Sequence, residues 1–334
     1  MKHVLVTGGA GFIGFHVVNK LLENNCRVSS IDNLNSYYSP KLKEDRLSVI
    51  KKRFQSNYNF IEGDITQDNF SNTFSKEKID IIIHLAAQAG VRNSIQNPKP
   101  YILNNIVGHF NVIELARKQK VKHLLSASTS SVYGGDRRPP FSEFANANLP
   151  IQLYAATKRA NEIVSHSYSA MFNIPTTMMR FFTVYGTWGR PDMALFKFVK
   201  SIQDGNPVEL YNRGNHSRSF TSVEDISETI IRLLDKPPML IDRGKEIDIV
   251  SAPYRELNIG NRKNENIKDF IRLIENCLNK KAKVKMLPLQ KGDVEESSCD
   301  PTQVESLTGY KIERSVETEI PKFIEWYKDY YELK

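Results

Sequence analysis

Short apolar runs alternate with amphipathic stretches through the first half of the chain. The runs are rich in valine, leucine and isoleucine and lie at 4–6, 27–31, 59–61, 79–84 and 121–125. A strand that is apolar on both faces is typical of a parallel sheet covered by helices on both sides. The alternation therefore predicts an α/β fold with a Rossmann-type, doubly wound parallel sheet.

The pattern changes near residue 182. A sixth strand is expected at 175–181, and beyond it the regular alternation of strands and helices stops. We therefore predict a first, cofactor-binding domain over 1–181 and a smaller α/β substrate domain that mainly covers 182–334, with a possible return of the chain to the sheet. The later segments predict a surface loop at 236–255 and helices near 266–278, 301–307 and 315–331.

The first apolar run ends in the glycine-rich segment T-G-G-A-G-F-I-G at 7–14, which an apolar helical pattern follows. Glycines at this spacing permit a tight turn and a close approach of backbone to a pyrophosphate at the helix amino terminus. Asp32 follows the second strand, where an acid binds the ribose hydroxyls of NAD. An alternative is that Asp32 is only a turn residue before Asn33.

Two further segments carry candidate chemistry. Tyr154 and Lys158 are four residues apart on a predicted helix, so an ammonium can lie near a phenol and favour its ionised form. A loop rich in serine is expected at 128–134, after the fifth strand. Both segments are expected at the carboxyl edge of the sheet, where their hydroxyl groups can meet a substrate.

Composition narrows the class of protein. The chain has 334 residues, of which 40% are hydrophobic and 25% are charged, as is usual for a soluble globular protein. The net charge is +8, but lysines and arginines are interspersed with acids, so we expect no nucleic-acid binding. No segment has the length and apolar character of a signal peptide or a membrane span, so we expect a cytoplasmic protein without membrane association. The cysteines and histidines show no spacing typical of a metal site.

The motifs together resemble those of the extended short-chain dehydrogenases/reductases, in the NAD-dependent epimerase/dehydratase family, and within it the UDP-glucuronate 4-epimerases. The resemblance covers nearly the whole chain. It rests on T-G-G-A-G-F-I-G, H-L-A-A-Q-A-G-V-R, S-T-S-S-V-Y-G, Y-A-A-T-K, R-F-F-T-V-Y-G-T-W-G-R-P-D-M-A and a closing G-D-V.

The resemblance implies roles for individual residues. It places the catalytic function on Thr129, Tyr154 and Lys158. It places NAD binding on Gly8, Gly11, Phe12, Ile13, Asp32, Asn33, Asp64, Ile65, Leu85, Ala86, Ala87, Lys158 and Phe181. Tyr154 is expected to take the proton of the sugar 4-hydroxyl while hydride leaves carbon 4 for a tightly held NAD. Hydride then returns to the other face of the 4-keto sugar, so NAD is regenerated.

Residue choices within the motifs favour a uronate. Related dehydratases carry an acid in the loop that here reads Thr129, Ser130 and Ser131, so dehydration is not expected. Ser130, Ser131 and Thr183 are instead predicted to bind the carboxylate of a UDP-hexuronate and to prevent its decarboxylation. Galactose-type epimerases carry Asn at the position of Thr183.

Other substrate contacts follow from the resemblance alone. Arg190 is expected to bind either the carboxylate or the diphosphate. Val208 is expected near the uracil, Arg218 at the diphosphate, and Asp293 at the uridine ribose. In the segment around Arg218, Ser219 and Ser222 replace an acid and an aromatic residue of the family pattern.

The sequence is compatible with three functions. The first is NAD-dependent 4-epimerisation of UDP-glucuronate to UDP-galacturonate. The second is 4-epimerisation of a neutral UDP-hexose, either UDP-glucose/UDP-galactose or their N-acetyl forms. The third is an NAD-sensing protein without turnover, which has no need of a base aimed at a hydroxyl. The family also suggests a homodimer built on helices near 98–119 and 153–170.

Overall fold

Seven strands form one parallel sheet in a computed structural model that describes residues 1–136, 138–240, 252–289 and 294–333. The strand order is β11-β6-β5-β4-β1-β2-β3. Their bounds are β1 His3–Thr7, β2 Arg27–Asp32, β3 Tyr58–Glu62, β4 Ile81–His84, β5 His123–Thr129, β6 Thr176–Phe181 and β11 Tyr254–Ile259. The doubly wound sheet predicted from the sequence is confirmed. The order reverses at β1, between β2 and β4, which is where such sheets bind ligands.

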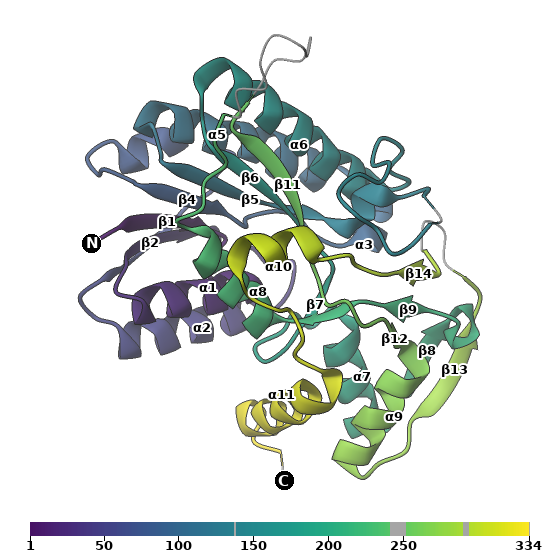
Figure 1. Cartoon of the computed structure of the whole chain (residues 1–334). Coiled ribbons are helices and arrows are strands. Elements are labelled where there is room, and N and C mark those ends of the chain that lie inside the picture. The colour runs from purple at the N-terminus through teal and green to yellow at the C-terminus, as the bar shows by residue number, and fades with distance from the viewer. Residues whose placement is uncertain (137, 241–251, 290–293, 334) are drawn as a thin grey trace.

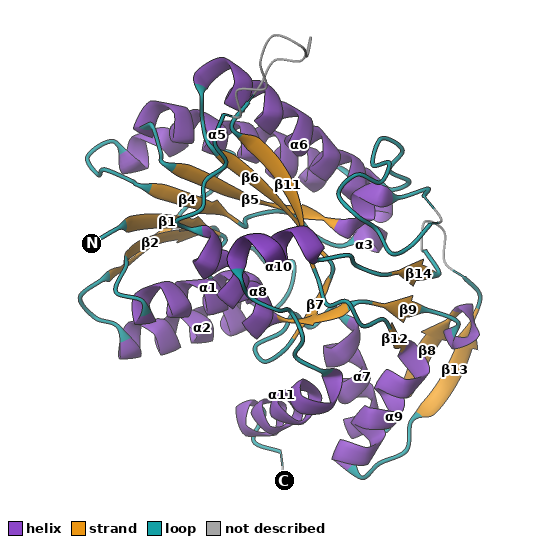
Figure 2. Ribbon diagram, viewed as in Figure 1, coloured by secondary structure: helices purple, strands orange, loops and turns teal. Residues whose placement is uncertain are grey.

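Helices cover both faces of the sheet (Figures 1 and 2). One face carries α1 Phe12–Glu23, α2 Pro40–Arg53 and α8 Val223–Leu233. The other carries α5 Gly108–Gln119 and α6 Leu153–Phe172. Shorter segments in this half are η1 Phe70–Phe74, α3 Val91–Gln96, α4 Lys99–Tyr101, the π-helical η2 Ile102–Val107 and η3 Ser130–Tyr133. Among the residues that the structure describes, no helix is long and apolar enough to cross a bilayer.

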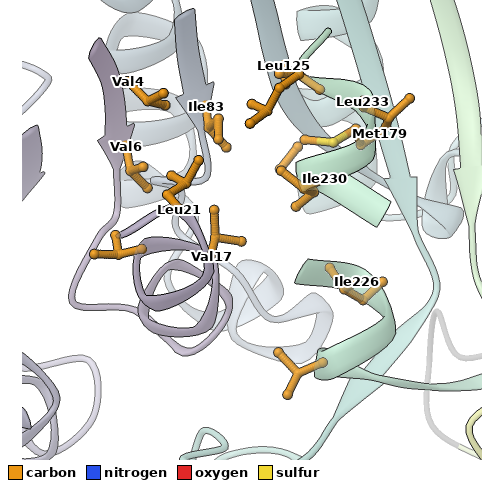
Figure 3. Packing of buried hydrophobic residues seen from close by; sticks show 14 of the residues in the cluster. Val4, Val6, Val17, Leu21, Ile83, Leu125, Met179, Ile226, Ile230 and Leu233 are labelled. Carbon is orange, nitrogen blue, oxygen red and sulfur yellow. The ribbon is translucent and has the colours of Figure 1, made fainter. Parts of the chain in front are cut away.

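Alternate side chains of each strand pack on opposite faces. Val4 and Val6 of β1 belong to a buried cluster with Leu21 of α1 and Ile230 of α8 (Figure 3). Leu5 points to the other face and joins the cluster under α5. Because successive side chains of a strand alternate in direction, an unbroken apolar run fills both cores at once. This explains why the runs predicted from the sequence are strands.

The second half of the chain builds a smaller lobe below the sheet in Figure 1. Its helices are α7 Ala194–Gln203, α9 Ile267–Leu278 and α11 Val316–Tyr330, whereas α10 Thr302–Thr308 packs on α8 and β11 against the sheet. Its strands are β7 Thr183–Tyr185, β8 Pro207–Tyr211, β9 Ser217–Arg218, β10 Phe220–Ser222, β12 Glu265–Asn266, β13 Lys283–Leu287 and β14 Glu296–Ser297, and η4 spans Asn212–Gly214. A separate buried cluster that includes Phe196, Val208 and Phe270 holds this lobe together.

The chain returns from this lobe to the sheet. Strand β11 pairs in parallel with β6, and α8 packs on α1 under the sheet. The surface loop predicted at 236–255 is therefore wrong at its end, because Tyr254 and Arg255 open β11; residues 241–251 lie outside the described part. Polar residues conceal this strand in the sequence, and they find partners only in the fold: Arg255 donates to Thr177, and Glu256 pairs with Arg180. The domain boundary near 182 stays a prediction.

Candidate active site

The turn between β1 and α1 lines a cavity of about 250 Å³ at the carboxyl edge of the sheet. Gly8 has a φ of +75°, and a Cβ atom built on it would lie 2.8 Å from the backbone nitrogen of Ala86. A Cβ atom on Gly14 would lie 2.1 Å from the Gly8 carbonyl oxygen. Both positions therefore require glycine. The amino end of α1 opens on this cavity, and its unpaired N–H groups suit the pyrophosphate of a dinucleotide.

Asp32 ends β2 and lines the same cavity. One of its carboxylate oxygens accepts a hydrogen bond of 3.0 Å from the backbone of Leu34 and lies 3.7 Å from Lys43 Nζ. A carboxylate in this place suits the two hydroxyls of an adenosine ribose and repels a 2′-phosphate. The residues present therefore fit NAD.

Asp64 follows β3 on the same wall. Asn33 Nδ2 donates to its carboxylate at 2.9 Å, and the backbone nitrogen of Thr66 donates at 2.8 Å. Burial alone would raise the pKa of Asp64, but these hydrogen bonds outweigh it and hold the pKa below its ordinary value. Asp64 is thus an ionised acceptor at neutral pH, which suits the amino group of an adenine ring.

The loop after β4 closes over the glycine turn. Ala86 N donates to Thr7 Oγ1 at 3.2 Å, and the same hydroxyl lies 2.7 Å from His84 Nδ1. Asn105 pins the far end of the loop, since its side chain accepts from Gln88 N at 2.8 Å and donates to Gln88 O at 3.0 Å. Asn105 lies in the π-helical segment η2, a type of irregularity that is frequent at functional sites.

The three predicted catalytic residues lie together on the wall of the cavity. Thr129 is the last residue of β5, while Tyr154 and Lys158 lie one turn apart on α6. Their spacing places both α6 side chains on the same face of the helix. Lys158 is only 2% exposed, and its ammonium donates to the carbonyl oxygen of Ala127 at 2.9 Å. The strand, the helix and their contact thus fix the geometry of all three groups.

Ser128 and Thr129 belong to strand β5 and not to the loop predicted from the sequence. Thr129 pairs with Phe181 of β6, and its hydroxyl accepts a hydrogen bond of 3.2 Å from Ser131 N at the start of η3. Thr129 thus pairs with the neighbouring strand through its backbone and caps the following turn through its side chain. The loop prediction was wrong at these first two residues, because serine and threonine in a strand resemble a turn in sequence, while Ser130–Tyr133 form the 3₁₀ turn η3.

The protonation balance differs from the one that the Tyr154–Lys158 spacing predicts. Burial raises the pKa of Tyr154 above its ordinary value, while the charge of Arg190 and a hydrogen bond with Thr129 lower it. Burial lowers the pKa of Lys158 to about 8, and Glu162 acts in the opposite direction. Arg190 is therefore the cation that favours the ionised form of Tyr154 in this structure, which the sequence did not reveal.

Arg190 lies at the junction between this cavity and a smaller one of about 20 Å³, and it lines both. It donates to the two carboxylate oxygens of Asp192 at 3.0 and 2.5 Å. Its guanidinium carbon lies 5.7 Å from the centre of the Tyr37 ring. The loop after β7 thus carries a fixed positive charge to the side of the cavity that holds Tyr154.

Every residue predicted to contact NAD lines the main cavity. These residues are Gly8, Gly11, Phe12, Ile13, Asp32, Asn33, Asp64, Ile65, Leu85, Ala86, Ala87, Lys158 and Phe181. They come from the ends of several strands and from two helices, so the fold brings together positions far apart in the sequence.

The residues predicted to bind the carboxylate do not line the main cavity, but each lies within two positions of a residue that does. Ser130 and Ser131 are in η3, and Thr129 Oγ1 donates to Ser131 Oγ at 3.2 Å. Thr183 opens β7 and lines the smaller cavity that shares Arg190 with the main one. Their binding roles remain predictions.

The other predicted substrate contacts lie in the smaller lobe. Val208 is 1% exposed, so its side chain belongs to the core of that lobe. The guanidinium of Arg218 donates to the backbone carbonyls of Ser217, Val294 and Glu295. Asp293 lies outside the described residues.

The two serines that depart from the family pattern near Arg218 are both buried and hydrogen-bonded. Ser222 donates to Glu319 at 3.0 Å and caps α8 by accepting from Glu224 N. Ser219 Oγ accepts from the backbone nitrogen of Cys299 at 2.9 Å. The two replacements are thus accommodated by local hydrogen bonds.

Part of the cavity wall was not predicted from the sequence. Tyr37, Tyr38 and Lys43 come from the segment after β2, and Asn104 and Met193 complete the wall elsewhere. No motif marks these residues except Met193, which lies within R-F-F-T-V-Y-G-T-W-G-R-P-D-M-A. The available signal was position, because N-L-N-S-Y-Y directly follows the second strand and so begins at the ligand-binding edge.

Comparisons with known proteins agree with this geometry. Residues 4–249 match the family model described as the NAD dependent epimerase/dehydratase family. A probable UDP-glucuronate 4-epimerase of Rhizobium meliloti is 43% identical, over 98% of this chain and 97% of that protein. A UDP-glucuronate 4-epimerase of Thermodesulfobacterium geofontis is 37% identical, over 100% of this chain and 98% of that protein.

A solved structure of the same family is also similar to this chain. It is the UDP-glucuronic acid 4-epimerase of Bacillus cereus in complex with UDP-glucuronic acid and NAD, with a TM-score of 0.88 and 29% identity. The match covers 98% of this chain and 100% of that one. The glycine turn, the parallel sheet and the match over most of the chain lead to one conclusion: this chain is a member of the NAD dependent epimerase/dehydratase family.

Proposed function

We propose that this protein is an NAD-dependent 4-epimerase that interconverts UDP-glucuronate and UDP-galacturonate through a transient 4-keto sugar. One observation carries the proposal: a single cavity joins a dinucleotide-binding turn to Thr129, Tyr154, Lys158 and the cation of Arg190. The curated relatives named as UDP-glucuronate 4-epimerases, and the similar structure that holds UDP-glucuronic acid and NAD, support it.

The residues of this chain account for the proton transfers. Tyr154 takes the proton of the sugar 4-hydroxyl and later returns it, so the cycle requires no net proton. Thr129 orients that hydroxyl, and Lys158 contributes a buried ammonium next to the site. Gly8, together with the amino end of α1, binds the cofactor pyrophosphate. NAD, when bound, supplies a reversible hydride acceptor for carbon 4.

The preference for a uronate is assigned to Arg190 and to neutral hydroxyls. Asp192 occupies the Nε and Nη2 edge of Arg190, so the guanidinium offers its remaining N–H donors to a substrate carboxylate, and the sugar of a neutral UDP-hexose has no such partner. Thr183 lines the smaller cavity together with Arg190, and Ser130 and Ser131 follow Thr129 at the edge of the main cavity, so these residues add hydroxyl donors. They hold the carboxylate of the 4-keto uronate, a β-keto acid, away from the geometry that releases carbon dioxide.

The homodimer suggested by the family remains part of this proposal. Large apolar side chains are exposed on η2, α5 and α6, among them Leu103, Phe110, Ile163 and Phe172, which are 42–58% exposed. Such a face on two neighbouring helices suits a second copy of the same chain. Phe110→Glu combined with Ile163→Glu is expected to halve the mass measured by sedimentation. The cytoplasmic location expected from the sequence also remains a prediction.

The substrate assignment is tested by turnover of two sugars. The enzyme is incubated separately with UDP-glucuronate and with UDP-glucose, and the 4-epimers are followed by proton NMR. The proposal expects UDP-galacturonate without release of carbon dioxide, and kcat/KM for UDP-glucuronate at least about a hundredfold above that for UDP-glucose. Faster turnover of UDP-glucose would instead identify a neutral-sugar epimerase.

A further inference from the structure

Three side chains join the two halves of the chain beside the cavity. Tyr37 comes from the loop between β2 and α2, whereas Arg190 and Asp192 come from the loop between β7 and α7. Asp192 accepts from Arg190 Nε at 3.0 Å and from Nη2 at 2.5 Å. The Tyr37 hydroxyl donates to the same carboxylate at 3.3 Å. One carboxylate thus receives donors from both halves.

These contacts restrict a side chain that is otherwise flexible. Arginine has several rotatable bonds, and ordering them costs conformational entropy. A carboxylate that accepts from two guanidinium nitrogens fixes the plane of the guanidinium as well as its position. The Tyr37 ring, 5.7 Å from the guanidinium carbon of Arg190, adds a cation–π contact. Arg190 is therefore held before any substrate arrives.

Tyr37 is itself confined by the loop that covers the cofactor turn. A Cβ atom on Gly90 would lie 2.6 Å from the Tyr37 hydroxyl, so only glycine leaves room for this ring. The Tyr101 hydroxyl donates to the carbonyls of Gly90 and Ala89 at 2.6 and 3.0 Å. The Tyr101 ring packs edge-on against Tyr154, with 6.2 Å between centroids. Contacts through Tyr37, Gly90 and Tyr101 thus connect Arg190 with the predicted catalytic residue Tyr154.

We infer that Asp192 is a positioning residue which, together with Tyr37, holds Arg190 where it meets the anionic group of the substrate. Asp192 is not among the residues that line the main cavity, so it acts through Arg190 and not by contact with the sugar. The inference rests on the proposed function, because Arg190 selects only a substrate that carries an anion near the reacting carbon.

The test compares Asp192→Asn with the unaltered enzyme. Loss of a charge-assisted contact is expected to raise KM for UDP-glucuronate about tenfold, with a smaller change in KM for UDP-glucose if that sugar is turned over. Asp192→Glu, which keeps the charge, is expected to restore part of the loss. Asp204→Asn is the matched control, since Asp204 pairs with Lys200 on the surface at 2.7 Å. Its KM is expected to stay within about twofold.

A purely structural role gives a different pattern. It would lower the apparent kcat through a smaller folded fraction and leave KM unchanged, and that outcome overturns the inference. A rise in KM below about threefold, or a decrease, overturns it as well. In a second variant pair, Tyr37→Phe removes only the hydroxyl that donates to Asp192, whereas Tyr37→Leu also removes the ring beside Arg190, so Tyr37→Leu is expected to raise KM more than Tyr37→Phe does. An unchanged KM in both variants overturns the role of Tyr37. If the unaltered enzyme fails to turn over UDP-glucuronate, the proposed function fails first.

Discussion

Glu162 accepts two hydrogen bonds from Arg180, at 2.8 and 2.9 Å, in the interior between α6 and β6. Their side chains are 0% and 1% exposed. Ser128 of β5 donates to the same carboxylate at 2.6 Å. Glu162 lies one turn beyond Lys158 on α6, so this buried pair anchors the catalytic helix to two strands of the sheet.

Removal of Arg180 is expected to destabilise the protein strongly. Arg180→Met leaves Glu162 as a buried charge without its main partner, which costs about 3–5 kcal/mol in the free energy of unfolding. Urea denaturation measures this change. The matched control is Arg272→Met on α9, whose pair with Asp269 is 72% and 64% exposed, and it is expected to change stability by less than about 0.5 kcal/mol. Equal effects of the two substitutions would contradict the assigned role.

Tyr154→Phe is expected to abolish most of the activity and to leave binding intact. Loss of a general acid–base group lowers kcat by about 10²–10⁴-fold. The dissociation constant for UDP-glucuronate, measured by calorimetry, is expected to change less than about threefold, because the ring remains. A variant with near-normal kcat would show that another group moves the proton.

The pH dependence follows from the charge of Arg190. Because Tyr154 works as a base in its ionised form and burial raises its pKa, kcat at saturating UDP-glucuronate is expected to rise with pH. Arg190 lowers that pKa, so Arg190→Gln should move the ascending limb to higher pH, by about one unit. Arg138→Gln is the control, since Arg138 is 81% exposed and pairs with Asp136. If the pH dependence of kcat is the same in Arg190→Gln as in the unaltered enzyme, Arg190 does not lower the pKa of Tyr154.

Alanine substitutions at two glycines with similar φ values distinguish the cost of backbone strain from the cost of a close contact. Gly8 and Gly205 have φ values of +75° and +71°, but only Gly8 faces backbone atoms within 3 Å of a built Cβ. Each substitution by alanine costs about 1–2 kcal/mol for the left-handed conformation. Gly8→Ala should additionally lose NAD during gel filtration, as measured by absorbance of the extracted cofactor. Retention of NAD by Gly8→Ala would show that this turn does not approach the cofactor.

Local patterns in the sequence were sufficient to predict the first half of the fold. Strands that are apolar on both faces and the glycine turn are marked by spacing alone, and the cofactor cavity follows from them. Strand β11 was missed because its outer residues are polar. Arg255 donates to Thr177, and Glu256 pairs with Arg180 and Arg159, all of which are distant from β11 in sequence.

The electrostatics of the site were not accessible from the sequence either. The effect of Arg190 on Tyr154 depends on the return of the loop after β7 to the cavity, and Tyr37 reaches the same place from the loop after β2. The contact of Tyr37 with Asp192 joins residues that are 155 positions apart. Spacing within a motif carries no information on such pairs.

The most direct test of the central claim follows the hydrogen on carbon 4. UDP-glucuronate labelled with deuterium at carbon 4 is incubated with the enzyme in ordinary water, without added reductant, and the product is analysed by NMR. Internal hydride return predicts UDP-galacturonate that keeps the deuterium at carbon 4. Loss of the label to solvent, or a pentose product with release of carbon dioxide, would contradict the account.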